Sequence, residues 1–331
     1  MSCWKNLESF ADVPKPSPTV VYEVRFMDGA FPIKQSPYRV SPDKRRILKE
    51  EVQFLLQHGL AEPSNSEWAS PCVLVPKPDG SFRLCTDYRK VNQLTRADSF
   101  PLPRIDDIID SVGNAAYVTK LDLLKGYYQI PLSEEAKKIS AFVTFDGLYQ
   151  YTVLPFGMRN PPAVFQRLKS VITTGLEGVS VYLDDLVVYS SSWPQHLAAF
   201  KALFQRLSDA KLTVNLAKTE FGHARITFLG LEVGGGIVAP VAAKVDAICK
   251  LPIPSNRKAV QRFLGMAGYY RRFCPNFSVV AAPLTDLVSP HKKFVWSPAC
   301  QTAFDNICSL LITTPVLRRF SSSIPSTSRC K

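Results

Sequence analysis

Two adjacent carboxylates near the middle of the chain are the residues best suited to chemistry. They belong to the tetrapeptide Tyr182-Leu183-Asp184-Asp185, which lies between two β-branched apolar runs at residues 179–181 and 186–189. Two such runs around a polar pair predict a strand, a tight turn and a second strand. The pattern therefore places Asp184 and Asp185 at the tip of a hairpin.

A third carboxylate lies upstream of this hairpin. Residues 117–123 predict a strand with Asp122 near its end, and Gly126 turns the chain away from it. If this strand pairs beside the hairpin, Asp122, Asp184 and Asp185 converge on one edge of a sheet. An ordinary surface aspartate and a plain hairpin turn are the alternative explanation.

Three converging carboxylates would suit magnesium, a hard cation that binds oxygen ligands and substrate phosphates. Such a cluster would hold two ions about 4 Å apart, one activating an attacking hydroxyl and the other stabilising the leaving oxygens. The predicted chemistry is in-line phosphoryl transfer by a metal-dependent nucleotidyl transferase.

The composition indicates a large globular chain. Its 331 residues are 46% hydrophobic and 21% charged, which predicts a sizeable core and two or three subdomains. Eight cysteines without a C-x-x-C pair and only four histidines argue against a zinc site and favour free thiols. No signal peptide or membrane span is predicted, so we expect an intracellular protein, in a cytoplasmic particle or the nucleus.

The charge of the chain favours a polyanionic partner. Lys and Arg total 40 against 28 acidic residues, a formal charge of +12. Residues 241–300 hold nine basic and two acidic residues, a net +7, with aromatic residues interleaved. Cations and rings in one segment suit a nucleic-acid groove, although a solvated helix face would give the same count.

The elements that must position these residues begin with a helix and a hairpin. Ser41 and Pro42 predict a helix start and Gly59 its end, with apolar residues at helical spacing between them. Residues 72–75 and 81–89 flank an Asp-Gly turn and predict a hairpin. Lys77 and Arg83 on this hairpin could reach a triphosphate, or could simply be surface charges.

A loop rich in Gly and Pro at residues 154–160 opens a helix at Pro161. Gly157 in this loop could let a nucleotide approach closely, although a plain junction would look the same. An extended segment is predicted over 1–40, with one strand at 20–26. A helix is predicted over 194–212, with Leu197, Phe200, Leu203, Phe204 and Leu207 on one face. Further predicted elements are strands at Lys218 and over 228–233, a turn at 234–236, a helix over 257–270 and a disordered tail at 321–331.

Several short motifs in a fixed order resemble the reverse transcriptase of gypsy-type LTR retrotransposons, over about residues 37–317. The motifs are residues 63–71, the hairpin 77–92, Lys120-Leu121-Asp122-Leu123, Leu154-Pro155-Phe156-Gly157, Ala163-Val164-Phe165-Gln166, Tyr182-Leu183-Asp184-Asp185, Phe228-Leu229-Gly230 and residues 263–273.

The resemblance implies an α+β right-hand polymerase with fingers, a palm of antiparallel sheet plus helices, and a thumb. The implied domains are an extended lead-in at 1–40, fingers and palm at 41–235, a thumb at 236–285, a partial connection region at 286–320 and a disordered tail at 321–331.

The resemblance also implies roles for particular residues. Asp122, Asp184 and Asp185 match metal-binding carboxylates, and Lys218 matches a candidate proton donor to pyrophosphate. The implied nucleotide-binding residues are Lys77, Arg83, Tyr127, Phe156 and Gly157, with Tyr127 as the steric gate that excludes a 2′-hydroxyl. The primer and template residues expected from the motifs and the basic helix are Tyr182, Phe228, Leu229, Gly230, Arg262, Gly265, Arg271 and Arg272.

The activity expected from this family is RNA-directed DNA synthesis. The expected cofactor is magnesium, as two ions, with manganese as a substitute, and the partners are an RNA or DNA template-primer, deoxynucleotides, and a second copy or a partner that supplies ribonuclease H. Two alternatives stay open: a copy that only binds nucleic acid, and a polymerase that makes RNA.

Three departures from the family pattern bear on these expectations. Pro161 replaces a usual small Ala, and Leu124-Lys125 and Tyr128 replace a usual Lys-Ser and His around the steric gate. After Asp286 the sequence has one acidic residue, Asp305, whereas a ribonuclease H site needs several carboxylates. We therefore expect no ribonuclease H activity in these residues.

Overall fold

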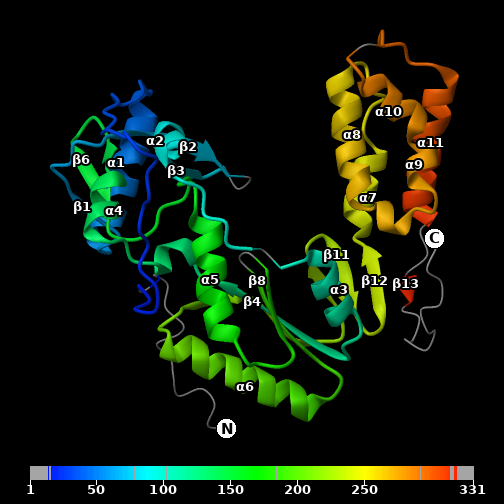
Figure 1. Ribbon diagram of the computed structural model, residues 1–331, viewed down its shortest axis with the longest axis horizontal. Coiled ribbons are helices and arrows are strands. Elements are labelled where there is room, and N and C mark those ends of the chain that lie inside the picture. Colours follow the sequence, from blue (N-terminus) through cyan, green and yellow to red (C-terminus); the bar gives the residue numbers. More distant parts are fainter. Residues whose placement is uncertain are drawn as a thin grey trace. The chain divides into compact units, whose positions relative to one another are not determined.

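The computed structural model describes Pro14, residues 16–77, 80–101, 103–182, 185–290 and 292–313, and the backbone of Leu317 and Arg318. The chain divides into two compact units, drawn in Figure 1. The first unit takes in Met1–Ile105, Thr119–Val188 and Trp193–Phe221. The second takes in Asp106–Val118, Tyr189–Ser192 and Gly222–Lys331.

A five-stranded sheet with short helices forms one part of the first unit. Its strand order is β1-β6-β5-β2-β3, antiparallel except where β2 pairs in parallel with β5. The elements are α1 (Pro42–Gln57), β1 (Ala61–Pro63), β2 (Ser70–Pro76), β3 (Phe82–Thr86), α2 (Arg89–Leu94), α4 (Glu134–Ile139), β5 (Phe142–Val143) and β6 (Leu148–Tyr151).

Helix α1 begins and ends where the sequence predicts. The Ser41 hydroxyl accepts a hydrogen bond from the Lys44 amide, Pro42 occupies the first turn, and Gly59 follows with a φ of +65°. The predicted hairpin of residues 72–75 and 81–89 is confirmed as β2–β3, except that the second strand ends at Thr86 and Arg89 already begins α2. Asp79 of the predicted turn lies outside the described residues.

A four-stranded sheet forms the other part of the first unit, in the order β7-β8-β4-β9. The β4 strand, predicted at residues 117–123, is therefore confirmed as the neighbour of the predicted hairpin. The elements are β4 (Tyr117–Leu123), the 3-10 helix η2 (Gly126–Gln129), α5 (Pro161–Thr173), β7 (Val179–Tyr182), β8 (Asp185–Ser190), α6 (Trp193–Asp209) and β9 (Val214–His223).

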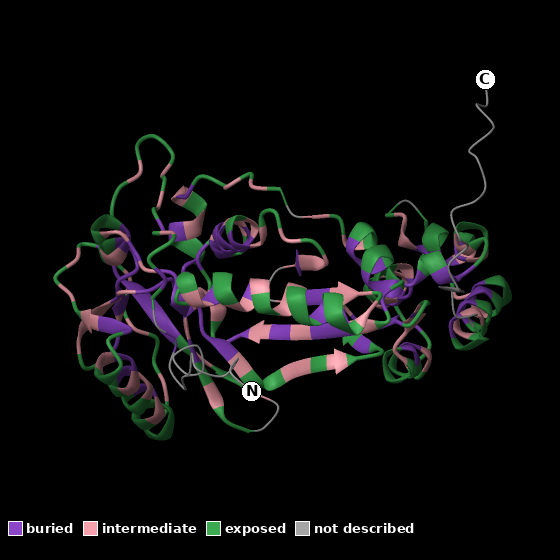
Figure 2. Cartoon of the chain, turned by 90° about the horizontal axis from the view of Figure 1, so that it is seen from below, coloured by how far each residue is buried: buried purple, intermediate pink, exposed green. Residues whose placement is uncertain are grey.

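Helix α6 covers one face of this sheet (Figure 1). Leu203 and Leu207 of α6 are fully buried in the same apolar core as Leu121 of β4 and Leu186 of β8. Figure 2 shows buried residues running along the strands and exposed residues on the outer helix surfaces. Leu197, predicted on the buried face of α6, is instead 43% exposed, because His196 takes the buried position and its ring nitrogen bonds the Thr119 hydroxyl.

The second unit combines a small sheet with a helical bundle (Figure 1). Its strands pair in the order β10-β11-β12-β13, and α3 packs on this sheet, since a Cβ at Gly113 would lie 2.7 Å from the Val238 side chain. The elements are α3 (Ile105–Gly113), β10 (Ile226–Phe228), β11 (Leu231–Gly234), β12 (Ile237–Pro240), α7 (Ala242–Cys249), α8 (Arg257–Tyr269), the 3-10 helix η3 (Arg271–Phe273), α9 (Phe277–Val280), α10 (Ala282–Val288), α11 (Pro298–Thr313) and β13 (Leu317–Arg318).

Two strand predictions are wrong. Residues 228–233 do not form one strand, because Leu229 and Gly230 have φ values of +49° and +79° and make a two-residue turn between β10 and β11. Residues 20–26 contribute only isolated bridges at Tyr22 and Phe26.

The segment predicted as a partial connection packs into the second unit through α11. Phe304 of α11 stacks against Phe263 of α8 with ring centroids 4.5 Å apart, and Ile307 and Leu311 are buried. The boundaries of fingers, palm and thumb stay predictions, and the tail at 321–331 lies outside the described residues. Within the described part of the chain, no helix is long and apolar enough to cross a membrane, and the cysteines described there are free thiols.

Candidate active site

Asp122 and Asp185 lie on neighbouring strands of the four-stranded sheet. Asp122 is near the end of β4 and Asp185 begins β8. Successive side chains of a strand point to opposite faces, so Lys120 and Asp122 share one face of β4, while Leu121 and Leu123 point into the core. Lys120 contacts Asp185, which places both carboxylates on this same face.

Each of these carboxylates has a lysine beside it. Lys218 of β9 places its Nζ atom 3.4 Å from Oδ2 of Asp122, and Lys120 of β4 places its Nζ atom 3.4 Å from Oδ1 of Asp185. The side chains of Asp122 and Asp185 are 26% and 23% exposed, so both remain open to a ligand.

Tyr182 and Asp185 are cross-strand partners on β7 and β8. The third predicted carboxylate, Asp184, lies outside the described residues. Asp122 and Asp185 offer the hard oxygen atoms that magnesium binds, on one face and about a quarter exposed, so these residues fit the cation that the sequence implies.

A buried glutamine fixes the chain on either side of this site. The Gln129 side chain is fully buried, donates hydrogen bonds to the carbonyl oxygens of Leu124 and Thr213 at 2.8 and 2.9 Å, and accepts one from the Thr213 amide at 2.7 Å. It therefore ties the turn after Asp122 to the start of β9.

The predicted steric gate, Tyr127, lies in the turn that follows Asp122. Its ring packs edge-on against Phe156 and Phe165, with centroids 5.2 and 5.4 Å away. A Cβ at Gly126 would lie 2.6 Å from the Phe165 ring, so only glycine permits this packing. The structure thus brings the gate and the predicted pocket loop together.

Two cationic side chains lie over aromatic rings in this part of the first unit. The Arg83 guanidinium lies over the Phe156 ring at 5.9 Å, and the Lys125 ammonium lies over the Phe54 ring at 4.7 Å. Burial, with the charge of Lys77, holds the pKa of Lys125 below its usual value, while Glu51 acts in the opposite direction. Lys77, Arg83 and Lys125 together favour an anionic ligand.

The loop at residues 154–160, which is predicted to lie beside the nucleotide, is shaped by contacts with the backbone of the first unit. Gly157 has a φ of +98°, and a Cβ there would lie 3.2 Å from the Thr86 carbonyl oxygen. Its own carbonyl accepts a hydrogen bond from the Asn92 side chain at 2.8 Å. Pro161, the departure from the family pattern, fits because it occupies the first turn of α5, where no amide hydrogen is needed.

Phe228, Leu229 and Gly230, which are predicted to bind the primer, lie in the second unit. The Phe228 ring is fully buried and contributes to packing, Gly230 is buried as well, and Leu229 is the partly exposed residue of the motif. The carbonyl oxygens of Leu229 and Gly230 accept hydrogen bonds from the hydroxyls of Tyr269 and Tyr270. The turn is therefore held against the end of α8.

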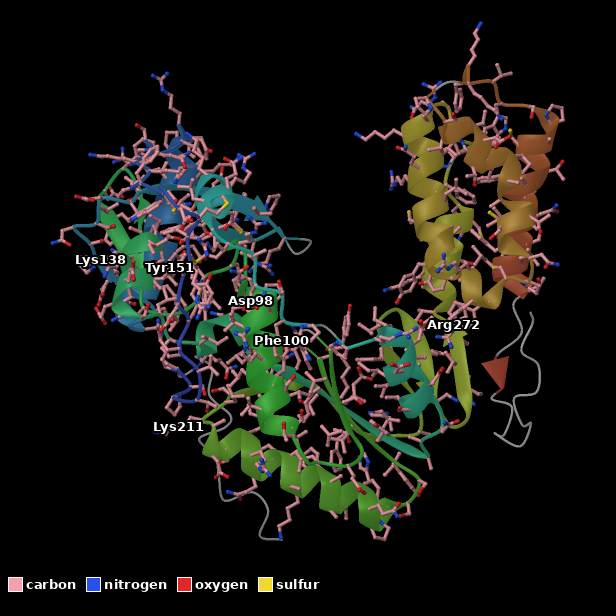
Figure 3. The ribbon with its side chains drawn as sticks, in the orientation of Figure 1. Asp98, Phe100, Lys138, Tyr151, Lys211 and Arg272 are labelled. Carbon is pink, nitrogen blue, oxygen red and sulfur yellow. The ribbon has the colours of Figure 1, made fainter. Side chains whose placement is uncertain are left out.

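Helix α8 has an exposed face suited to a polyanion. Arg262 and Gly265 are exposed, and a Cβ at Gly265 would meet nothing within 4 Å. Arg271 is also exposed, whereas Arg272 pairs with Asp106 and Asp110 of α3 at 3.0 and 3.1 Å (Figure 3). Arg272, predicted to bind nucleic acid, is thus engaged within its own unit.

Sequence reasoning missed Lys120 and Lys125. Lys120 stands two residues before Asp122, a strand spacing that places both side chains on one face and could have identified it. Lys125 was noted only as a departure from Ser; its contact with Phe54 joins residues far apart in sequence and left no local signal.

The α+β fold thus places a carboxylate pair on neighbouring strands and an aromatic cluster at the turn that follows Asp122. Residues 75–233 match the family model for reverse transcriptase (RNA-dependent DNA polymerase). The chain therefore carries a reverse transcriptase domain of the kind found in retrotransposon Pol polyproteins.

The similar curated proteins come from retrotransposons. The chain is 38% identical over 295 residues to the retrovirus-related Pol polyprotein from transposon 297 of Drosophila melanogaster, covering 87% of this chain and 28% of that protein. It is 30% identical over 313 residues to the transposon Tf2-3 polyprotein of Schizosaccharomyces pombe, covering 94% and 24%. The chain thus spans about a quarter of the length of these relatives.

The similar solved structures are viral. The dRH form of the foamy viral protease-reverse transcriptase, in complex with double-stranded DNA, matches with a TM-score of 0.85 and 25% identity, covering 94% of this chain and 56% of that one. The foamy viral protease-reverse transcriptase in complex with an RNA/DNA hybrid has the same fold, with a TM-score of 0.79, 24% identity, and coverage of 92% and 41%.

Proposed function

We propose that this chain is an RNA-directed DNA polymerase that adds deoxynucleotides to a primer 3′-hydroxyl on an RNA or DNA template. The observation that carries the proposal is the placement of Asp122 and Asp185 on adjacent strands, facing the same side of the sheet and partly exposed. The match of residues 75–233 to the reverse transcriptase family supports it.

Asp122, Asp184 and Asp185 would hold two magnesium ions, with manganese as a substitute. When bound, such ions supply activation of the primer hydroxyl and stabilise charge on the phosphate oxygens. The Lys218 side chain is 66% exposed and reaches Asp122, so it can donate a proton to the leaving pyrophosphate.

The incoming deoxynucleotide would occupy the space beside Tyr127. Lys77, Arg83 and Lys125 would bind its triphosphate: Arg83 lies over the Phe156 ring that packs on Tyr127, Lys125 stands two residues before Tyr127, and the charge of Lys77 acts on Lys125. Tyr127 would exclude a 2′-hydroxyl by steric contact, since Phe156 and Phe165 pack against its ring and prevent it from turning away.

Each unit carries residues predicted to bind the template-primer. In the first unit, Tyr182 at the end of β7 would contact the primer. In the second unit, the turn at Leu229 and Gly230 would contact nucleic acid through Leu229, which is partly exposed. The exposed face of α8, with Arg262 and Gly265, would follow a duplex groove. The DNA and RNA/DNA complexes of the similar foamy viral structures support such a partner. A homodimer, a partner that supplies ribonuclease H, and the cellular compartment stay predictions from the sequence.

Primer extension on a poly-ribonucleotide template tests the proposal. The chain should extend a labelled DNA primer in magnesium, whereas Asp185→Asn should lose extension by about 10³-fold or more, because the cation site loses a charged ligand. Asp146→Asn, which breaks an exposed ion pair with Arg45 in the same unit, is the matched control and should extend normally.

Two results would contradict the proposal. If Asp185→Asn extends as well as the unaltered chain, the site has been misplaced. If the unaltered chain binds the hybrid but extends nothing, the chain is a nucleic-acid-binding module.

A further inference from the structure

Lys120 and Asp185 form a partly buried ion pair within the first unit. The Lys120 Nζ atom lies 3.4 Å from Oδ1 of Asp185, and the two side chains are 21% and 23% exposed. In the Arg46–Glu50 pair, by contrast, the side chains are 74% and 65% exposed. Because water screens the Lys120–Asp185 pair less, the lysine charge acts strongly on this carboxylate.

The position of Lys120 in the sheet extends its influence beyond Asp185. Lys120 stands two residues before Asp122 on β4, so its side chain leaves the face from which both aspartates project. A positive charge on that face repels any cation that the aspartates hold. Lys120 therefore opposes the divalent cations that Asp122 and Asp185 attract.

The two lysines of the site differ in their freedom to move. Lys218 reaches Asp122 from β9 with a side chain that is 66% exposed, so it can turn into solvent when a cation arrives. Lys120 is enclosed between β4 and β8 and keeps its charge in place. Of the two, Lys120 has the lasting effect on cation affinity.

We propose that Lys120 is a positioning residue of the cation site, which orients the Asp185 carboxylate and keeps the affinity of the site for divalent cations low. The proposal rests on the proposed function, because it takes Asp122 and Asp185 to be cation ligands. A weakened site binds the cation more tightly once nucleotide phosphates add their own oxygen ligands. Lys120 thus couples cation binding to nucleotide binding.

Manganese titration of the purified chain, followed by electron paramagnetic resonance without primer, tests this role. Lys120→Met should bind Mn²⁺ about three- to tenfold more tightly than the unaltered chain, whereas Lys120→Arg, which keeps the charge, should stay within about twofold. In an Asp185→Asn background, the effect of Lys120→Met should shrink by about half or more, because the lysine acts through Asp185.

The same titration with added deoxynucleotide gives a second measurement. Nucleotide should tighten Mn²⁺ binding less in Lys120→Met than in the unaltered chain, because the altered site is already filled. If Lys120→Met fails to fold by circular dichroism, Lys120→Gln keeps a polar end at the same position and takes its place.

Lys137→Met is the matched control. Lys137 is 20% exposed, as Lys120 is, and pairs with Glu134 of the same unit at 2.7 Å, away from both aspartates in sequence. It should leave Mn²⁺ affinity unchanged. If Lys120→Met and the unaltered chain bind Mn²⁺ equally well, or if Lys137→Met raises the affinity as much as Lys120→Met does, the proposal for Lys120 is overturned while the proposed function is not. If Asp122→Asn removes none of the Mn²⁺ binding, the aspartates do not hold the cation, and the proposed function is overturned as well.

Discussion

Arg272 and Asp110 are joined by an ion pair, with Nη2 of Arg272 lying 3.1 Å from Oδ1 of Asp110, while Nη1 lies 3.0 Å from Asp106. The arginine thereby fastens the end of α8 and η3 to α3 within the second unit (Figure 3). Its guanidinium also lies over the Phe273 ring at 5.6 Å. These contacts hold in place an arginine that the sequence assigned to nucleic acid.

Substitution of Arg272 should therefore affect stability more than binding. Arg272→Ala should lower the free energy of unfolding by about 1 kcal/mol, a modest value because both aspartates are more than half exposed. Arg262→Ala should leave stability unchanged but reduce the slope of log affinity against log salt by about 0.9, because one phosphate contact is lost. Urea denaturation measures the free energy of unfolding, and filter binding at several salt concentrations measures the slope. If Arg272→Ala reduces the slope and leaves stability unchanged, Arg272 belongs to the binding surface.

Substitution of Tyr127 should relax sugar selection. Tyr127→Val removes the ring that Phe156 and Phe165 hold in place, so a ribonucleotide should be incorporated about 10- to 100-fold more readily relative to the deoxynucleotide. The ratio of the two kcat/KM values measures this change. Tyr128→Phe alters the adjacent buried ring and is the control; an equal effect from Tyr128→Phe would show that general disturbance of the turn is responsible.

The sequence predicted the elements that carry the catalytic aspartates, because each has a strong local signal. Residues 117–123 predicted the strand that carries Asp122, and the paired apolar runs predicted a hairpin with Asp185 at its tip, where the structure has Asp185 begin β8. The turn at Leu229 and Gly230 was missed, because a leucine at positive φ is uncommon and the surrounding residues are apolar. Apolar pattern alone did not distinguish a hairpin from one strand.

Contacts between residues far apart in sequence were harder to predict from the sequence. The ion pairs of Lys120 and Arg272 depend on which elements lie side by side, and neither arginine nor lysine reveals its partner through local spacing. The prediction that Phe228 binds the primer came from a motif, whereas the burial of its ring follows from packing of the second unit. A motif identifies which positions belong to a binding segment, whereas the packing of the fold determines which of their side chains are exposed to a ligand.

Loss of the Gln129 side chain should destabilise the turn that follows Asp122. Gln129→Leu removes the partners of the Leu124 carbonyl and the Thr213 amide, while the Thr213 carbonyl keeps the Leu124 amide, so the free energy of unfolding should fall by about 2 kcal/mol. Thermal and urea denaturation measure this loss. Gln205→Leu removes an exposed side-chain contact with Asp209 and should change stability little. Equal losses in the two variants would show that the three hydrogen bonds of Gln129 contribute nothing specific.

High pH should destabilise the first unit through its buried tyrosines. Burial, with the nearby charge of Asp98, raises the pKa of Tyr22 to about 12, and burial also raises the pKa values of Tyr88, Tyr128 and Tyr151. The unfolded chain loses these protons near pH 10, before the folded chain does. Stability is therefore complete below pH 10 and falls between pH 10 and 12, at about 1.4 kcal/mol per pH unit for each tyrosine.

Urea denaturation between pH 8 and 11.5, with tyrosinate absorbance as a second signal, measures this fall. In Tyr22→Phe, the free energy of unfolding should fall less steeply with pH, by the amount that one tyrosine contributes to the slope. It should cost little at pH 8, because the Tyr22 hydroxyl has no hydrogen-bond partner among the described residues. Early titration of Tyr22, near pH 10 in the folded protein, would show that its ring is open to water rather than buried.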